Sequence, residues 1–316
     1  MGHCFGVVPS RRLGRSLGVN NIPYKHCSYS CVYCQLGPTS SLTVRRRAFY
    51  HPSEVVEDVQ KALRRVGEEN VDYVTFVPYG EPTLDVNLGL ELEMLKETVS
   101  KPLAVLTNAS LLWREDVAFD LLTADLVSIK VDAALPSVWE AVNRPHSSLS
   151  LWRILEGVEE FSRSYGGRLI VETMLIEGVN DDLESIVAVA NALERIRLDR
   201  VYIAVPTRPP AERWVKPASE EKLVQAYMKI EEKMPGRVEL LTRVESGSFK
   251  GLYGKAESSI LSIASVHPLL LDHALRIAES LGEDAPSLIE KLLASGKARL
   301  VEYEGRRYIV SRTRLS

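Results

Sequence analysis

Short runs of β-branched and aliphatic residues alternate with longer amphipathic stretches along most of the chain. The apolar runs predict strands at 16–22, 74–77, 103–106, 126–131, 169–175 and 201–205. Apolar positions recur at helical spacing between them, for example over 52–66, 183–193 and 219–234. Because parallel strands need crossover connections, this alternation predicts an α/β fold, a partial (β/α)6 barrel of TIM type, with functional side chains where strands end.

The pattern changes near residue 251. Helices are expected at 258–265, 269–281 and 286–295, followed by a hairpin over 298–310 that turns at Glu304 and Gly305. We therefore predict a barrel domain over 1–250 and a small winged-helix-like domain over 251–316. Arg306 and Arg307 fall at the tip of the predicted wing, but the fold alone does not decide between nucleic-acid binding, protein docking and a cover for the barrel.

Composition narrows the class of protein. The chain has 316 residues, 45% of them hydrophobic, and a formal net charge of −3. That charge argues against a generally basic surface that would coat nucleic acid. No run reaches the roughly 18 apolar residues that a membrane helix needs, so we expect a cytoplasmic protein without a membrane partner.

The cysteines supply the first candidate chemistry. Three of the four, Cys27, Cys31 and Cys34, have the spacing CxxxCxxC on the loop after the first predicted strand. In a reducing compartment such a cluster indicates a metal or redox site. Three thiolates suit a [4Fe-4S] cluster and leave its fourth iron open, as a catalytic metal requires. The remaining Cys4 is expected to be an ordinary thiol.

Other interpretations use the same cysteines. A zinc site would add His26, although residues adjacent in sequence rarely both reach one tetrahedral metal. A non-catalytic electron carrier would need Cys4 as a fourth ligand, and a zinc-stapled RNA-binding protein would need the broad positive charge that this chain lacks.

The segment from His26-Cys27 to Cys31-Val32-Tyr33-Cys34 resembles the signature of radical S-adenosylmethionine (SAM) enzymes. The segments VPSRRLGRSLGVNNIPYKHCSYSCVYCQLGPT, PYGEPTL and PTRPPAERWVKP extend the resemblance over about 1–245, to an uncharacterised iron–sulfur oxidoreductase group broadly similar to the radical enzymes that form wyosine bases in tRNA. The resemblance implies an enzyme whose [4Fe-4S] cluster reductively cleaves SAM to a 5′-deoxyadenosyl radical, which abstracts hydrogen from a substrate. It makes tRNA a candidate substrate, and a ferredoxin or flavodoxin the expected reductant.

The resemblance also assigns SAM contacts. The aromatic residue before the third cysteine, here Tyr33, lies near the adenine in that family. The family's GGEP motif, which holds the SAM amino group, matches Tyr79, Gly80, Glu81 and Pro82, with Tyr79 in place of the first glycine.

Later strand ends add further polar candidates. Asn108 follows the third strand, and Ser128, Lys130 and Asp132 alternate along the fourth. A lysine that faces into a barrel needs an anion, and the SAM carboxylate is one. Ser128 or Asp132 would bind the ribose hydroxyls, while Glu172 points either toward SAM or outward.

Substrate contacts are expected on the loops at the barrel mouth. Arg208 and Trp214 lie in the loop over 206–217, and Arg144 follows the fourth strand. Arginines and an indole suit phosphate and stacking contacts. The same residues are also consistent with a stiff proline-rich loop whose charges face water. Arginines at 11, 12, 15 and 45–47 flank the cysteine loop and are candidates for RNA contact or for a solvated face.

Overall fold

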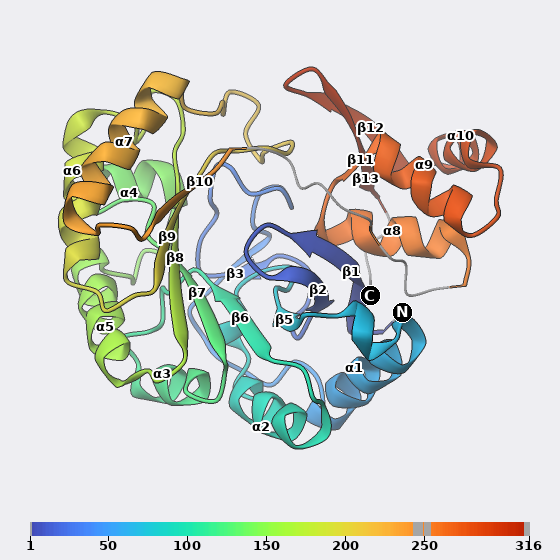
Figure 1. Cartoon of the computed structure of the whole chain (residues 1–316), viewed down its shortest axis with the longest axis horizontal. Coiled ribbons are helices and arrows are strands. Elements are labelled where there is room, and N and C mark those ends of the chain that lie inside the picture. Colours follow the sequence, from blue (N-terminus) through green and yellow to red (C-terminus); the bar gives the residue numbers. More distant parts are fainter. Residues whose placement is uncertain (1, 243–248, 250–253, 313–316) are drawn as a thin grey trace.

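The computed structural model describes residues 2–242, 249 and 254–312. One curved sheet forms its centre (Figure 1). Its strands lie side by side in the order β1 (Cys4–Ser10), β2 (Gly14–Val19), β5 (Tyr73–Phe76), β6 (Leu103–Thr107), β7 (Leu126–Lys130), β8 (Arg168–Met174), β9 (Arg200–Ala204) and β10 (Val238–Leu241). All neighbours from β2 to β10 are parallel, which confirms the predicted α/β fold.

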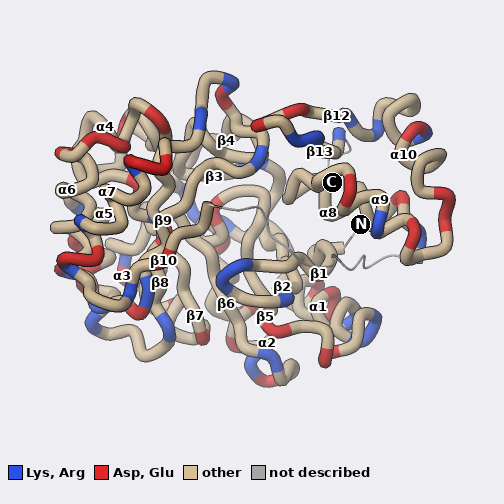
Figure 2. Tube along the Cα trace, turned by 45° about the horizontal axis from the view of Figure 1, so that its top comes forward, with Lys and Arg blue, Asp and Glu red and all other residues tan. Residues whose placement is uncertain are grey.

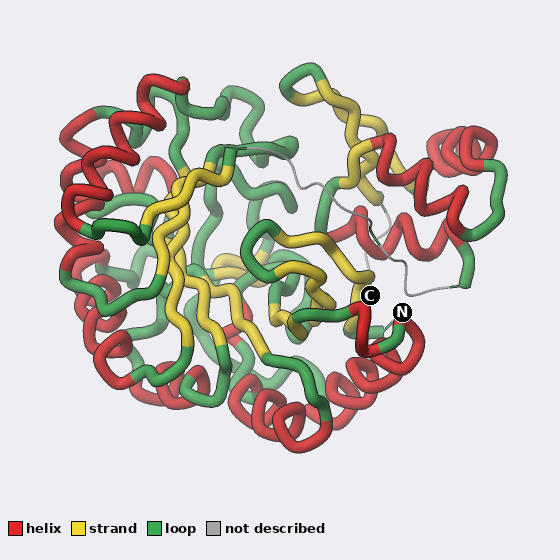
Figure 3. The backbone as a smooth tube through the Cα atoms, viewed as in Figure 1, coloured by secondary structure: helices red, strands yellow, loops and turns green. Residues whose placement is uncertain are grey.

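Helices cover the outer face of the strands (Figure 3). They are α1 (Pro52–Val66), α2 (Leu88–Thr98), α3 (Glu115–Leu121), α4 (Pro136–Asn143), α5 (Leu151–Ser164), α6 (Leu183–Glu194) and α7 (Glu220–Lys233), with short 3-10 turns η1 (Glu68–Asn70) and η2 (Pro82–Leu84). The apolar stripe of α1 is buried as its spacing predicts, with Pro52 in its first turn. The N-cap of α6 is Asp182, whereas Asn180 accepts a hydrogen bond from Ile176 in the preceding turn.

The sequence pattern does not predict β1 or β10. Strand β1 pairs antiparallel with β2, and its residues from Cys4 to Val8 are buried on both faces. Cys4 and Val7 belong to the barrel core, while Phe5 and Val8 belong to the core of the C-terminal unit. A strand covered on both faces has no alternation of apolar and polar residues, so the hydrophobic pattern does not predict β1.

The C-terminal unit, residues 254–312, is a second small fold. It comprises α8 (Ala256–Val266), β11 (Leu269–Leu270), α9 (Leu271–Ser280), α10 (Ala285–Ala294), β12 (Ala298–Tyr303) and β13 (Arg306–Ser311). The three strands form an antiparallel sheet in the order β11-β13-β12, and Glu304 and Gly305 turn the hairpin with positive φ. The expected small C-terminal sheet is therefore present, with a short strand ahead of the second helix. The predicted boundary at 250/251 lies outside the described residues.

The C-terminal unit packs against β1, the edge strand of the sheet (Figure 1). Positive and negative residues are interspersed along the outer helices and the C-terminal unit (Figure 2). None of the described helices has the length and apolar character needed to cross a membrane.

Candidate active site

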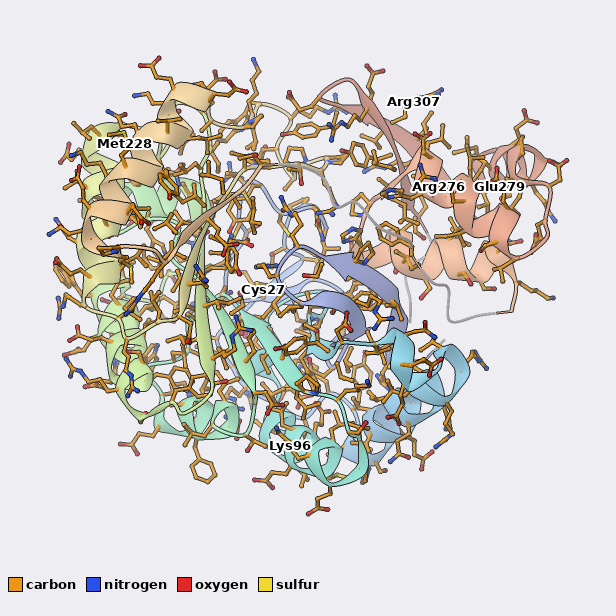
Figure 4. The ribbon with its side chains drawn as sticks, in the orientation of Figure 1. Cys27, Lys96, Met228, Arg276, Glu279 and Arg307 are labelled. Carbon is orange, nitrogen blue, oxygen red and sulfur yellow. The ribbon has the colours of Figure 1, made fainter. Side chains whose placement is uncertain are left out.

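The cysteine loop begins at β3 (His26–Cys27), which pairs in parallel with β4 (Ser41–Leu42). The backbone N–H groups of Ser30 and Val32 donate to the carbonyls of Asn143 and Val142 at 3.0 Å, so the end of α4 supports this loop. Cys27, Cys31 and Cys34 all line one cavity of about 370 Å³. Cys27 lies in the interior, whereas Lys96 and Met228 lie on the outer helices (Figure 4).

Each of the three thiols lies against a different N–H donor. Lys25 Nζ is 3.2 Å from Cys34 Sγ, Asn108 Nδ2 is 3.5 Å from Cys27 Sγ, and Asn143 Nδ2 is 3.5 Å from Cys31 Sγ. Donors of this kind stabilise thiolate ligands and tune a bound iron–sulfur centre. From the sequence we predicted that Asn108 contacts SAM, and we did not predict that Lys25 and Asn143 donate to the thiols. Lys25 carries no signal in its spacing, and Asn143 is distant from the cysteines along the chain.

The environment of Cys27 and Cys31 favours the protonated form of each thiol. Burial, with a smaller contribution from Glu81, raises the pKa of the Cys27 thiol. Burial, with Asp132 nearby, raises the pKa of Cys31 to about 12. Metal binding at such thiols is coupled to proton release.

His26 and Cys4 are not part of the group formed by the three cavity cysteines. His26 Nε2 is 2.9 Å from Arg47 Nη2, and its ring meets Phe49 edge-on at 5.5 Å between centroids. Cys4 is buried in the barrel core and does not line the cavity. Across the described residues, no three His, Cys, Asp or Glu side chains converge on one ion position. Cys27, Cys31 and Cys34 share the wall of the cavity, whereas neither His26 nor Cys4 lines it.

The turn from Tyr79 to Pro82 is hydrogen-bonded to β3, the short strand that carries Cys27. Glu81 N donates to His26 O at 3.0 Å, and a Cβ on Gly80 would lie only 1.7 Å from that same oxygen. Glycine is therefore required for this approach. Tyr79, Gly80 and Glu81 line the cavity, and Pro82 is buried behind it at the start of η2.

The carboxylate of Glu81 holds neighbouring loops together. It accepts hydrogen bonds from Thr83 N at 3.1 Å, from the hydroxyls of Thr83 and Thr107, and from Asn108 N at 2.7 Å. A buried carboxylate with so many donors orients the strand ends around it.

Lys130 and Ser128 line the cavity, and Lys130 already has anionic partners. Lys130 Nζ is 2.8 Å from Glu172 Oε1 and 3.3 Å from Asp132 Oδ1, and it lies 4.9 Å from the centre of the Tyr33 ring. Glu172 faces the cavity and also pairs with Arg12. Although burial raises the pKa of Glu172, Arg12 and Lys130 together lower it to about 2.

Asp132 lies behind the cavity wall. Its carboxylate accepts hydrogen bonds from the Tyr33 hydroxyl, from Asn143 Nδ2 at 2.8 Å and from Met174 N at 2.8 Å. It thereby orients Tyr33, which lines the cavity, and Asn143, which contacts Cys31.

Of the three expected substrate contacts, the structure brings only Arg208 to the cavity. Arg144 caps α4 with a left-handed backbone and pairs with Glu212. Trp214 is 49% exposed and does not line the cavity. Val266 and His267 of the C-terminal unit complete the wall, a contribution that no sequence signal indicated.

Comparisons with known proteins show which sequences and folds this chain resembles. A family model for the radical SAM superfamily matches residues 21–193. The chain is 41% identical over 306 residues to a UPF0026 protein of Methanocaldococcus jannaschii, covering 96% of this chain and 94% of that one. It is 32% identical over 273 residues to a UPF0026 protein of Helicobacter pylori strain J99, covering 85% and 86%. A radical SAM methyltransferase structure from Sphaerobacter thermophilus shares the fold with a TM-score of 0.58 and 16% identity, over 72% of this chain and 66% of that one.

Proposed function

The chain belongs to the radical SAM superfamily and, within it, to the UPF0026 proteins, and from this premise we propose that it cleaves SAM reductively and removes a hydrogen atom from a substrate. Membership makes it an enzyme and implies a [4Fe-4S] cluster and SAM as cofactors. When bound, these cofactors supply the electron and the 5′-deoxyadenosyl radical.

One observation carries the proposal: three thiols line a single cavity, and each has its own N–H donor. Cys27, Cys31 and Cys34 would hold the cluster. With Cys4 outside the cavity, the described residues offer no fourth cysteine there, and this disfavours a closed electron-carrier site.

The chain's other cavity residues would bind and orient SAM. Tyr33 offers a ring for the adenine, and Asn108, Ser128 and the turn around Gly80 offer polar atoms. Lys130 would contact the SAM carboxylate while remaining paired with Glu172. Pro82 and Asp132 would act from behind the wall by shaping the turn and holding Tyr33.

A tRNA substrate stays a prediction, and so does a ferredoxin or flavodoxin as reductant. Several arginines on which the RNA hypothesis depended have internal partners. Arg12 pairs with Glu172, Arg15 with Asp72 at 2.8 Å, and Arg46 with Asp116 at 2.8 Å. These pairs reduce the positive charge that phosphate binding would use.

Iron content and electron paramagnetic resonance of anaerobically reconstituted protein test the cluster directly. We expect about four irons per chain and a reduced [4Fe-4S] signal. Replacing Cys27, Cys31 and Cys34 together by Ala should remove both, whereas Cys4→Ala should retain both. Protein that takes up one zinc and no iron, or that loses its cluster in Cys4→Ala alone, would contradict the proposal.

A further inference from the structure

Ser28, the residue that follows Cys27, is hydrogen-bonded to two segments that lead to the outer surface. Its hydroxyl lies 2.6 Å from the hydroxyl of Ser110, and its carbonyl accepts a hydrogen bond from His146 N at 2.9 Å. Ser110 leads along the chain to Trp113, and His146 leads to the start of α5. The cysteine loop is therefore joined to both segments beside one of the residues that would hold the cluster.

Trp113 continues this contact toward solvent. Its Nε1 donates to Ser110 O at 3.0 Å. Its half-buried side chain packs against one apolar cluster that Cys27 and Cys31 also contact. Hydrogen bonds and van der Waals contacts thus lead without interruption from Trp113 to the cysteine loop. Because electron transfer through protein weakens steeply with distance, this short path is a suitable route for an electron.

The first turns of α5 cover Trp113 and carry exposed groups. Gly157 allows the approach, because a Cβ there would lie 2.4 Å from Trp113 Cα. One turn earlier, the guanidinium carbon of Arg153 lies 3.8 Å from the centre of the Trp113 ring. Trp152, next to Arg153, is 71% exposed. Tryptophan and arginine are enriched among the residues that anchor protein interfaces, so this surface has the composition of a docking site.

The charge of this surface favours an acidic partner. Within the described part of the chain, no carboxylate pairs with Arg153. The first turn of α5 contains no acidic residue, and the side chain of its N-cap, Ser150, makes no capping hydrogen bond. The positive end of the helix dipole therefore adds to the charge of Arg153.

We propose that Trp113, Trp152 and Arg153 form the docking surface for the electron donor, and that this donor is a small acidic ferredoxin. The inference rests on the proposed function and names the partner of the same site. Low-potential ferredoxins, at about −400 mV, suit the reduction of an iron–sulfur cluster. One electron leaves the reduced ferredoxin, which is oxidised, and passes by way of Trp113, Ser110 and Ser28 to the cluster on the cysteine loop, which is reduced. No bond forms or breaks in this step.

Calorimetric titration of oxidised ferredoxin into the reconstituted protein measures docking without turnover. Wild type should bind, with an affinity that falls as ionic strength rises, because the contact joins opposite charges. Trp152→Ala and Arg153→Glu should each weaken binding about tenfold, as expected for anchor residues of an interface. The matched control is Arg276→Glu, at an exposed arginine of α9 in the C-terminal unit (Figure 4), and it should bind as wild type does.

The release of 5′-deoxyadenosine separates docking from the chemistry of the site. With reduced ferredoxin as the only reductant, at concentrations below saturation, Trp152→Ala and Arg153→Glu should release it more slowly than wild type. With dithionite, a small reductant that needs no docking surface, both variants should release it as wild type does. Damage to the fold would instead slow both reactions.

The inference is overturned if ferredoxin does not bind wild type, if both variants bind ferredoxin as wild type does, or if flavodoxin is bound and used in its place. The proposed function fails separately, through absence of the cluster or of 5′-deoxyadenosine release with dithionite.

Discussion

The hydroxyl of Tyr79 lies 2.8 Å from the hydroxyl of Ser265, and this contact links the Gly80 turn to the C-terminal unit. Tyr79 stands where the related motif carries glycine. Its side chain is buried in the core of the C-terminal unit, and its backbone N–H donates to Asn20 Oδ1 at 2.9 Å. Tyr79 therefore links the barrel to the C-terminal unit through a contact that glycine could not make.

Removing either hydroxyl should weaken this link. Tyr79→Phe and Ser265→Ala should each lower the free energy of unfolding by about 1 kcal/mol. Because they share one hydrogen bond, the double variant should lose less than the sum of the two. Denaturant unfolding of the four proteins measures the coupling, and strictly additive losses would mean that the two hydroxyls act independently.

Gly80→Ala should disrupt the site. The added Cβ would meet His26 O at 1.7 Å, so the turn must move away from the cysteine strand. We expect less bound iron and weaker SAM binding, measured by metal analysis and calorimetry. Gly166→Ala is the control, because a Cβ at Gly166 has no atom within 4 Å. Equal iron and SAM binding in the two variants would show that the close approach does not matter.

Lys25→Met should lower the reduction potential of the bound cluster. Lys25 Nζ is 3.2 Å from Cys34 Sγ, and a positive donor there favours the more negative, reduced state. Losing a hydrogen bond of about 0.5–1.5 kcal/mol corresponds to roughly 20–65 mV for one electron. A redox titration followed by electron paramagnetic resonance measures the shift. Lys96→Met, on the outer surface beside Asp125, should leave the potential unchanged.

The cysteine cavity could be predicted because its ligands are close together in sequence and their spacing is itself the signal. The Gly80 turn and the polar residues at the strand ends could also be predicted, because each is a short pattern of neighbouring residues. Lys25, Asn143 and His267 could not be predicted as site residues, because their roles depend on contacts between distant segments. Asn143 Nδ2 reaches Cys31 Sγ from across 112 positions, and His267 reaches Arg208 across 59. The SAM carboxylate was expected to meet Lys130, and the sequence could not reveal that Glu172 already pairs with this lysine.

Glu91→Gln should stabilise the protein as the pH rises. Both carboxyl oxygens of Glu91 are buried, and this burial, with Asp85 nearby, raises its pKa from 4.5 to about 9 against a smaller opposing effect of Asn21. The folded state therefore holds a proton that the unfolded state loses. Stability from this group is complete below pH 4.5 and falls between pH 4.5 and 9, by at most about 1.4 kcal/mol per pH unit.

Glutamine is uncharged, so the Glu91→Gln variant should not lose this stability as the pH rises. Unfolding free energies of the two proteins should be similar at pH 4.5 and diverge in favour of Glu91→Gln toward pH 9. A difference that does not change with pH would mean that Glu91 does not titrate in this range.

The most direct test of the account is the release of 5′-deoxyadenosine from SAM by anaerobically reconstituted, dithionite-reduced protein. Wild type and Cys4→Ala should release it, slowly even without substrate. The variant with Cys27, Cys31 and Cys34 all replaced by Ala should release none, because the thiols that hold the cluster in the cavity are gone. Wild-type protein with a full cluster and no 5′-deoxyadenosine, or equal release by the triple variant, would contradict the account.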